Sequence, residues 1–300
     1  MGENMWPNLF KRTPKLDLDP ERAQQTMALF DEKQGYQSYA KRCQTAFSGT
    51  TNSAPSLLKQ QGVEHLQVLS EQDASSFLAQ ALSLAEETIS KQEIDYSEIL
   101  LIRDKVFLDT WFHKIFTPAL TSTLTNYFES EFSIYWYTFL RAKPAVGATR
   151  SFLWHCDKGP SAHLKILLYL NDVQEHQGNT IFLNRATTTR FAQSGYVFGS
   201  VKKRMDDLSE LARQEGISLQ PQSWDLKAGE GIAFEPSQVL HKGILPSTGY
   251  RYVLAFCLLP SPLPWDMAFR NNHHEGFSSS YTWHSNAQEI WSLIQQAPNT

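Results

Sequence analysis

The 300-residue chain has little of what identifies several large protein classes. It holds only three cysteines, Cys43, Cys156 and Cys257, an odd and widely spaced set that does not form a disulfide pattern. No apolar run approaches the roughly 18 residues that a membrane helix needs. The first residues also do not resemble a secretory leader. We therefore expect reduced thiols, no membrane partner and a cytoplasmic location.

An excess of positive charge and three familiar catalytic motifs are missing as well. The formal net charge is −4, which disfavours a nucleic-acid partner because such binding depends on Lys and Arg neutralising phosphates. The chain has no Gly-x-Ser-x-Gly elbow, no glycine-rich phosphate loop and no Cys-x-x-Cys pair. What remains, 41% hydrophobic and 19% charged residues, is typical of an ordinary globular protein.

Residues 1–130 are predicted to be mainly helical. One helix is expected to begin at Asp19-Pro20, where an N-cap precedes a proline at the first helical position. A second follows Ser70, and a third covers Pro118 to Glu129. The second has an apolar stripe consisting of Phe77, Leu78, Leu82 and Leu84. We expect these helices to cover the outside of a sheet.

From about residue 131 the pattern changes to short strands separated by turn residues. The predicted strands are 132–143, 149–157, 164–171, 179–184, 231–235, 238–244 and 250–259. Such a series predicts an α+β protein whose core is a double-stranded β-helix, the jelly roll that cupins also use. We expect one domain over 1–300, with its core at 131–260, an insert at 184–226 and a C-terminal extension at 261–300.

His155 and Asp157 are two residues apart, so in a strand their side chains point to the same face. His241 could complete a facial set of two histidines and one carboxylate, which leaves coordination positions open and is typical of non-haem Fe(II) oxygenases. A His-x-Asp pair alone is weak, since the chain has nine histidines. The others, among them His163, His176, His273, His274 and His284, are expected to be surface or loop residues.

Arg251 follows His241 by ten residues and begins a strongly predicted strand. If residues 246–249 form a hairpin turn, Arg251 lies about 10 Å along the strand from His241. Its planar guanidinium can grip a carboxylate with two parallel hydrogen bonds.

The set His155-x-Asp157, His241 and Arg251 resembles the Fe(II)/2-oxoglutarate-dependent oxygenases, most closely their phytanoyl-CoA dioxygenase-like and prolyl-hydroxylase-like branch. The resemblance covers about residues 134–259. It implies that the first three residues bind Fe(II) and that Arg251 binds the co-substrate 2-oxoglutarate. It also implies use of O₂, with hydroxylation, desaturation or ring formation on a small metabolite or amino-acid-like substrate and release of succinate and CO₂.

The same resemblance suggests further co-substrate ligands. Tyr169, in Leu168-Tyr-Leu-Asn171, matches a tyrosine that helps to hold the distal carboxylate in prolyl-hydroxylase-like relatives. Lys165 shares a strand face with Tyr169 and either enters the same pocket or is a sheet-edge lysine. Tyr137 is expected to point inward together with Tyr135, either toward the co-substrate or into the core.

The insert at 184–226 is long for a connection between barrel strands, and such segments are often lids or binding loops. Its Arg185 and Arg190 could meet an acidic group on the substrate, and 201–212 is expected to form a lid helix. A solvated decoration is the alternative. Two other functions also remain open: a cupin-like metal- or ligand-binding module without redox turnover, and a protein hydroxylase.

Overall fold

A computed structural model describes residues 36–49, 56–85, 97–147, 150–157, 163–196, 204–271 and 275–276. The helix expected at Asp19-Pro20, the histidines at 273, 274 and 284, and most of the 261–300 extension lie outside these residues. The division of the chain into 1–130, 131–260 and 261–300 stays a prediction. Among the described residues, no helix is both long and apolar enough to cross a membrane.

The largest element is a seven-stranded sheet in the order β1-β6-β4-β8-β3-β2, with β9 pairing in parallel with β3. The pairs along that path are all antiparallel. The strands are β1 (Val63–Gln67), β2 (Ser97–Leu100), β3 (Glu131–Ala142), β4 (Leu164–Tyr169), β6 (Glu230–Phe234), β8 (Arg251–Ser261) and β9 (Glu275–Gly276). The two outer strands of the path, β1 and β2, were not predicted.

A smaller sheet pairs β5 (Thr180–Phe182) with β7 (His241–Gly243). Isolated bridges extend it, from His155 to His241 on one side and from Phe182 to Gln222 on the other. From β3 to β8, most successive segments alternate between the large and the small sheet. This alternation is the double-stranded β-helix, so the predicted α+β jelly-roll fold is confirmed.

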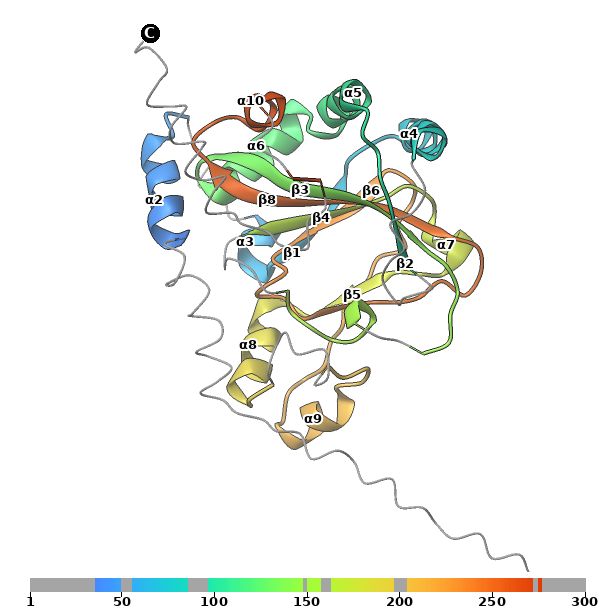
Figure 1. Ribbon diagram of the computed structural model, residues 1–300. Coiled ribbons are helices and arrows are strands. Elements are labelled where there is room, and N and C mark those ends of the chain that lie inside the picture. The colour runs from blue at the N-terminus through green and yellow to red at the C-terminus, as the bar shows by residue number, and fades with distance from the viewer. Residues whose placement is uncertain are drawn as a thin grey trace, which may run out of the picture.

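Helices cover one face of the large sheet, and the small sheet lies toward its other face (Figure 1). The covering helices are α4 (Glu71–Leu84), α5 (Lys105–Ile115), α6 (Pro118–Phe128) and α10 (Trp265–Arg270). α8 (Arg185–Gln193) and α9 (Ser209–Gln214) lie below the small sheet in the view of Figure 1. The remaining helical segments are α2 (Tyr36–Ala46), α3 (Leu57–Gln61), α7 (Val173–His176) and a 3₁₀ turn at Arg150–Phe152.

The predicted helices at 70 and 118 are confirmed, and their caps explain where they begin. Ser70 accepts from the backbone N–H of Asp73, and Thr117 accepts from Leu120, so each side chain satisfies one free helical N–H. The buried stripe of α4 differs from the prediction: it consists of Ala74, Phe77 and Ala81, whereas Leu82 and Leu84 are both 39% exposed.

Strand β8 separates the helix-covered core from the interior between the sheets. Its even residues Leu254, Phe256 and Leu258 belong to the cluster that packs under the helices, and the Phe256 ring lies 5.1 Å from that of Phe112 in α5. Its odd residues, among them Arg251 and Ala255, line a pocket on the other face. The period of two in a strand thus assigns one face to stability and the other to the site.

A β-bulge in β3 places Tyr137 in the core, one of the two positions expected for it, and not at the co-substrate. The pairing with β8 shifts between Ile134 and Trp136, so Tyr135 is the extra residue and the later side chains exchange faces. Tyr137 therefore packs under the helices, with its ring 5.2 Å from Phe112, and burial raises the pKa of its phenol. Trp136 takes the inner face instead.

Two other strand predictions were wrong in detail. Of the strand predicted at 149–157, the described residues 150–157 form a 3₁₀ turn followed by bridge residues and are not a continuous strand. The strands around His241 and Arg251 do not form a hairpin, because β7 pairs with β5 whereas β8 pairs with β3 and β4. Both strands nevertheless contribute to the same pocket, because the two sheets face each other.

Candidate metal centre

Two backbone hydrogen bonds hold the two histidines of the predicted ligand set side by side. The N–H of His155 donates to the carbonyl of His241 at 3.0 Å, and the N–H of His241 donates back to the carbonyl of His155 at 2.9 Å. Residues paired in this way across antiparallel segments present their side chains to one face. The ring centroids lie 4.3 Å apart, and both side chains are buried.

Backbone carbonyls fix the tautomer of both imidazoles. His155 Nδ1 lies 2.7 Å from the carbonyl oxygen of Leu153, and His241 Nδ1 lies 2.8 Å from that of Val239. A carbonyl can only accept, so each Nδ1 carries the proton and each Nε2 keeps its lone pair. Metal-binding histidines in proteins are usually oriented by this kind of contact.

Asp157 completes the group. Its Oδ1 is 3.4 Å from Nε2 of His155 and 3.9 Å from Nε2 of His241. The three potential ligand atoms all lie within 4.8 Å of one another. One metal ion with bonds of about 2 Å can therefore reach all three after a small contraction. Neutral imidazoles and one carboxylate on one side of an ion suit Fe(II), so these residues fit the predicted metal.

Lys165 reaches Asp157 from the large sheet. Its ammonium forms an ion pair with Oδ2, the oxygen that does not face the imidazoles, and lies 5.5 Å from the centre of the Trp136 ring. Burial alone would raise the pKa of Asp157, but the nearby ammonium of Lys165 outweighs it and holds the pKa well below its usual value. Burial, together with the nearby His155, holds the pKa of His241 well below its ordinary value. Asp157 is thus ionised and His241 neutral at pH 7, the forms in which both bind metals.

The triad opens into a cavity of about 130 Å³ between the two sheets. Arg251 enters this cavity from β8. It lies six residues before Cys257, the residue that pairs with Lys165, so the Cα atoms of Arg251 and Cys257 are roughly 20 Å apart along the strand. Arg251 Nη1 donates to the carbonyl oxygens of Asn179 at 2.7 Å and Ile244 at 3.3 Å. The cavity therefore has a carboxylate and two imidazoles toward one end and a guanidinium toward the other.

Tyr169 does not line this cavity, contrary to the prediction. Its side chain is fully buried, and its hydroxyl makes hydrogen bonds of 3.2 Å with Oδ1 of Asn179 and with Oγ1 of Thr180. Because the carbonyl of Asn179 accepts from Arg251, Tyr169 supports the segment that orients the arginine.

Several lining residues were not predicted from the sequence. Trp136 was missed because the bulge was not visible in the sequence, and Ser151 and Phe152 because their segment was expected to be a strand. Thr180 begins β5 next to Asn179 and lines the cavity without forming part of any motif. At Gly243 an added Cβ would lie 2.8 Å from the Phe152 ring, so only glycine leaves room for that side of the pocket.

Cys156, between the two proposed ligands in sequence, is buried on the opposite side. It clusters with Trp154, Leu183 and Leu240, as predicted for a small apolar residue that points away from the site. Burial raises the pKa of its thiol well above the ordinary value. All three cysteines are free, in line with the expected reduced thiols, and Cys43 and Cys257 are buried as well.

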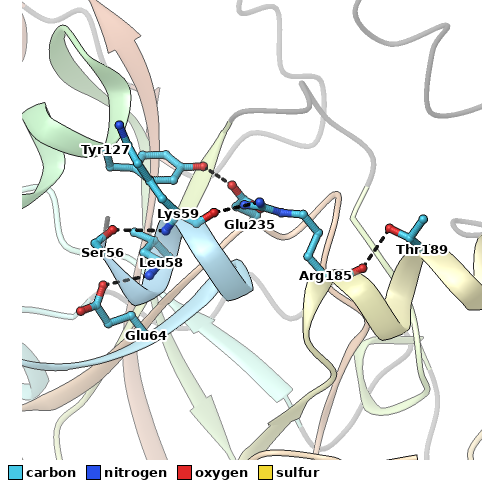
Figure 2. Close-up of polar contacts among 8 residues, drawn as sticks. All are labelled: Ser56, Leu58, Lys59, Glu64, Tyr127, Arg185, Thr189 and Glu235. Carbon is cyan, nitrogen blue, oxygen red and sulfur yellow. Dashed lines mark hydrogen bonds and ion pairs between the residues drawn. The ribbon is translucent and has the colours of Figure 1, made fainter. Parts of the chain in front are cut away.

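The arginines proposed to bind substrate from the insert have structural partners instead. Arg185 donates through Nε to Oε2 of Glu235 at 2.8 Å and through Nη1 to the carbonyl oxygen of Lys59 at 2.9 Å (Figure 2). Arg190 donates to the carbonyl oxygen of Gly216 at 2.8 Å. The lid helix expected at 201–212 is α9, Ser209–Gln214, and residues 201–203 lie outside the described part.

Buried Glu235 anchors the loop that leads to His241. Besides Arg185, Tyr127 of α6 donates to its Oε1 at 2.6 Å, so helices from two parts of the chain meet on one carboxylate (Figure 2). The next residue, Pro236, accepts from the N–H of Asp157 at 2.6 Å. At the other end of the loop, Thr188 of α8 accepts from the N–H of Leu240 at 2.9 Å. α8 thus braces the loop that leads to His241.

Glu235→Ala should lower the free energy of unfolding by roughly 3 kcal/mol, because it leaves Arg185 and Tyr127 without their buried acceptor. The matched control is Glu210→Ala in the exposed Glu210–Arg213 pair, whose side chains are 59% and 72% exposed. That change should leave the unfolding midpoint close to that of the wild type, because exposed ion pairs contribute little to stability. Urea unfolding of both variants measures the difference. Equal unfolding midpoints for the two variants would show that the contacts of Glu235 with Arg185 and Tyr127 do not stabilise the fold.

Comparison with known proteins gives similarity in fold only. No protein-family model matches the chain, and no curated protein is significantly similar to it. EctD from S. alaskensis, solved with 2-oxoglutarate and 5-hydroxyectoine, is 18% identical over 79% of this chain and 86% of its own, with a TM-score of 0.49. The alpha ketoglutarate dependent carbocyclase SnoK from nogalamycin biosynthesis is 13% identical over 71% and 88%, with a TM-score of 0.48.

HygX from Streptomyces hygroscopicus, solved with nickel and 2-oxoglutarate, is 15% identical over 69% of this chain and 86% of its own, with a TM-score of 0.44. At such identities and TM-scores the similarity carries no argument about what this chain binds.

Proposed function

We propose that this chain is an Fe(II)- and 2-oxoglutarate-dependent oxygenase that acts on a small molecule. One observation carries the proposal: a facial group of His155, Asp157 and His241 shares a cavity with Arg251. A metal site alone would suit many functions. A guanidinium facing the same cavity adds a partner for the carboxylate of a ligand whose other end binds the metal.

Each residue has a defined part in this proposal. Nε2 of both histidines and Oδ1 of Asp157 would hold Fe(II), which when bound supplies the centre at which O₂ is activated. Arg251 would bind the distal carboxylate of 2-oxoglutarate, and its bonds to Asn179 and Ile244 already hold it in place. Pre-orientation lowers the ordering cost of binding.

The apolar walls of the cavity contribute by limiting water. Leu140, Phe152, Leu167 and Ala255 lie among the polar groups of the lining. Charge–charge contacts are stronger in such surroundings than in water, and a reactive centre is protected from side reactions. Hydroxylation is the default outcome that we propose, with desaturation and ring formation as variants on the same site.

A cupin-like binding module is the alternative from another class. It would bind metal without consuming 2-oxoglutarate, and it gives no reason for an arginine in the same cavity. A protein hydroxylase would use the same residues and differs only in its substrate.

The distinguishing experiment incubates the protein aerobically with Fe(II) and 2-oxoglutarate. The oxygenase should form succinate and CO₂ in equal amounts, slowly without primary substrate, and only when both Fe(II) and O₂ are present. Metal binding with unchanged 2-oxoglutarate would favour the binding module. Stimulation by peptides but not by metabolites would favour the protein hydroxylase.

A further inference from the structure

The cavity that holds the metal triad and Arg251 is small. At about 130 Å³ it falls below the roughly 300–1,000 Å³ of typical ligand pockets. If 2-oxoglutarate fills it, as the proposed function requires, the primary substrate has to be held by residues around the triad that lie outside the cavity. Substrate-binding groups are therefore expected in the segments that border His155 and Asp157.

Arg204 of the insert lies in this position. The N–H of Trp154 donates to the carbonyl oxygen of Met205 at 2.8 Å, and the two residues form an antiparallel bridge. Continued by one residue, this register sets Arg204 opposite His155. Residues opposite each other on antiparallel segments point to the same face, which for His155 is the face of the triad.

The electrostatics agree with that placement. Burial lowers the pKa of Arg204, and the Asp157 carboxylate is near enough to oppose that shift. The positive charge of Arg204 in turn acts to lower the pKa of the Lys165 ammonium, although that pKa is raised overall. The guanidinium is therefore close to both members of the Asp157–Lys165 pair.

Arg204 also has a donor without an acceptor. Its Nε is buried and has no hydrogen-bond partner in the part of the chain that the structure describes. By contrast, Nε of Arg185 and of Arg213 each donate to a carboxylate, of Glu235 and Glu210 respectively. A buried donor left unpaired costs about 1–3 kcal/mol, so the vacant bond of Arg204 points to an acceptor that binds there.

The charge balance indicates what kind of acceptor this is. Among the described groups that line the cavity or face Asp157, the cations Lys165, Arg204 and Arg251 outnumber the one carboxylate by two. A dicationic metal and a dianionic co-substrate cancel each other and leave that excess unchanged. A neutral or cationic substrate would not relieve it.

We propose that Arg204 binds an anionic group, a carboxylate or a phosphate, on the primary substrate. The substrate would thus be held by its charge on the insert side of the triad, while Arg251 holds the co-substrate. This inference rests on the proposed function and adds the chemical class of the substrate. The competing role for Arg204 is a second contact to 2-oxoglutarate.

The variants are Arg204→Gln and, as the matched control, Arg190→Gln, an arginine of the same insert that donates to a backbone carbonyl. In a first arm, calorimetry measures 2-oxoglutarate binding to the Ni(II)-loaded proteins. Arg204→Gln should bind it within about twofold of wild type. A loss as large as that of Arg251→Ala would assign Arg204 to the co-substrate and overturn the inference.

In a second arm, acetate and inorganic phosphate are titrated into the protein loaded with Ni(II) or Zn(II) and 2-oxoglutarate. The readouts are calorimetry and, with diamagnetic Zn(II), the Nε–Hε NMR signal of Arg204, assigned by its absence in Arg204→Gln. One anion should shift this signal saturably, and Arg204→Gln should weaken its binding about tenfold while Arg190→Gln leaves it unchanged. The tighter of the two anions identifies carboxylate or phosphate.

No saturable shift with either anion, or equal binding in Arg204→Gln and wild type, would refute the anion site. Failure of the proposed function is a separate result, because wild type would then bind no 2-oxoglutarate in the first arm. The anion titration of the metal-free protein would still report on Arg204 in that case.

Discussion

The double variant Asp157→Ala/Lys165→Met should fold like the wild type and lose its affinity for Fe(II) by more than about 100-fold. Removal of a residue that merely supports a metal ligand costs 10–100-fold, so removal of the ligand itself should cost more. Asp157→Ala alone is a poorer test. It leaves the ammonium of Lys165, which is only 15% exposed, without its partner, and such a loss can cost 3–5 kcal/mol of stability.

Lys165→Met is the matched control for this experiment. It keeps the proposed ligands and removes a cation that competes for Asp157, so metal binding should persist or tighten. Anaerobic calorimetry with Fe(II) compares the two variants, and circular dichroism checks that both are folded. Equal affinity in Lys165→Met and in the double variant would show that Asp157 is not a ligand.

Arg251→Ala should weaken 2-oxoglutarate binding by about 2–5 kcal/mol, at least roughly 30-fold, because the distal carboxylate loses a charged partner in a partly dry pocket. Binding of the metal alone should not change. Arg251→Lys should restore affinity only in part, since an ammonium cannot reproduce the planar fork.

Arg251 also donates to the carbonyls of Asn179 and Ile244, so thermal unfolding of each variant has to accompany the binding measurement. Arg190→Ala, which removes an arginine outside the cavity, provides the control. If Arg251→Ala is folded and binds 2-oxoglutarate like the wild type, Arg251 does not bind the distal carboxylate.

The sequence predicted the triad because its information is local. A His-x-Asp pair fixes two side chains on one face within three residues, and His241 lies within a predicted strand. The structure brings the two together through a backbone bridge, although 149–157 is not a regular strand. The jelly roll was likewise predictable from a series of short apolar segments, each of which is interpreted through the two-residue period of a strand.

What could not be predicted depends on pairing between distant segments. The bulge at Tyr135, which turns Tyr137 away from the site, arises only in the register of β3 against β8. The assignment of β7 and β8 to different sheets replaced the expected hairpin for the same reason.

The insert shows the same limit for charged residues. Arg185 and Arg190 are cations in a long connection, which suggested a role in substrate binding, but Arg185 pairs with Glu235 and Arg190 with a backbone carbonyl. Arg204 belongs to no sequence motif, and its position opposite His155 is inferred from the bridge between Trp154 and Met205.

The central claim is that one cavity holds a metal at its triad and a dicarboxylate between that metal and Arg251. The most direct measurement is an anaerobic titration of the Fe(II)-loaded protein with 2-oxoglutarate, followed by visible absorption. Chelation of Fe(II) by the 2-oxo acid should give a charge-transfer band that saturates at one equivalent and needs far more co-substrate in Arg251→Ala. A protein that binds Fe(II) yet develops no band would contradict the account.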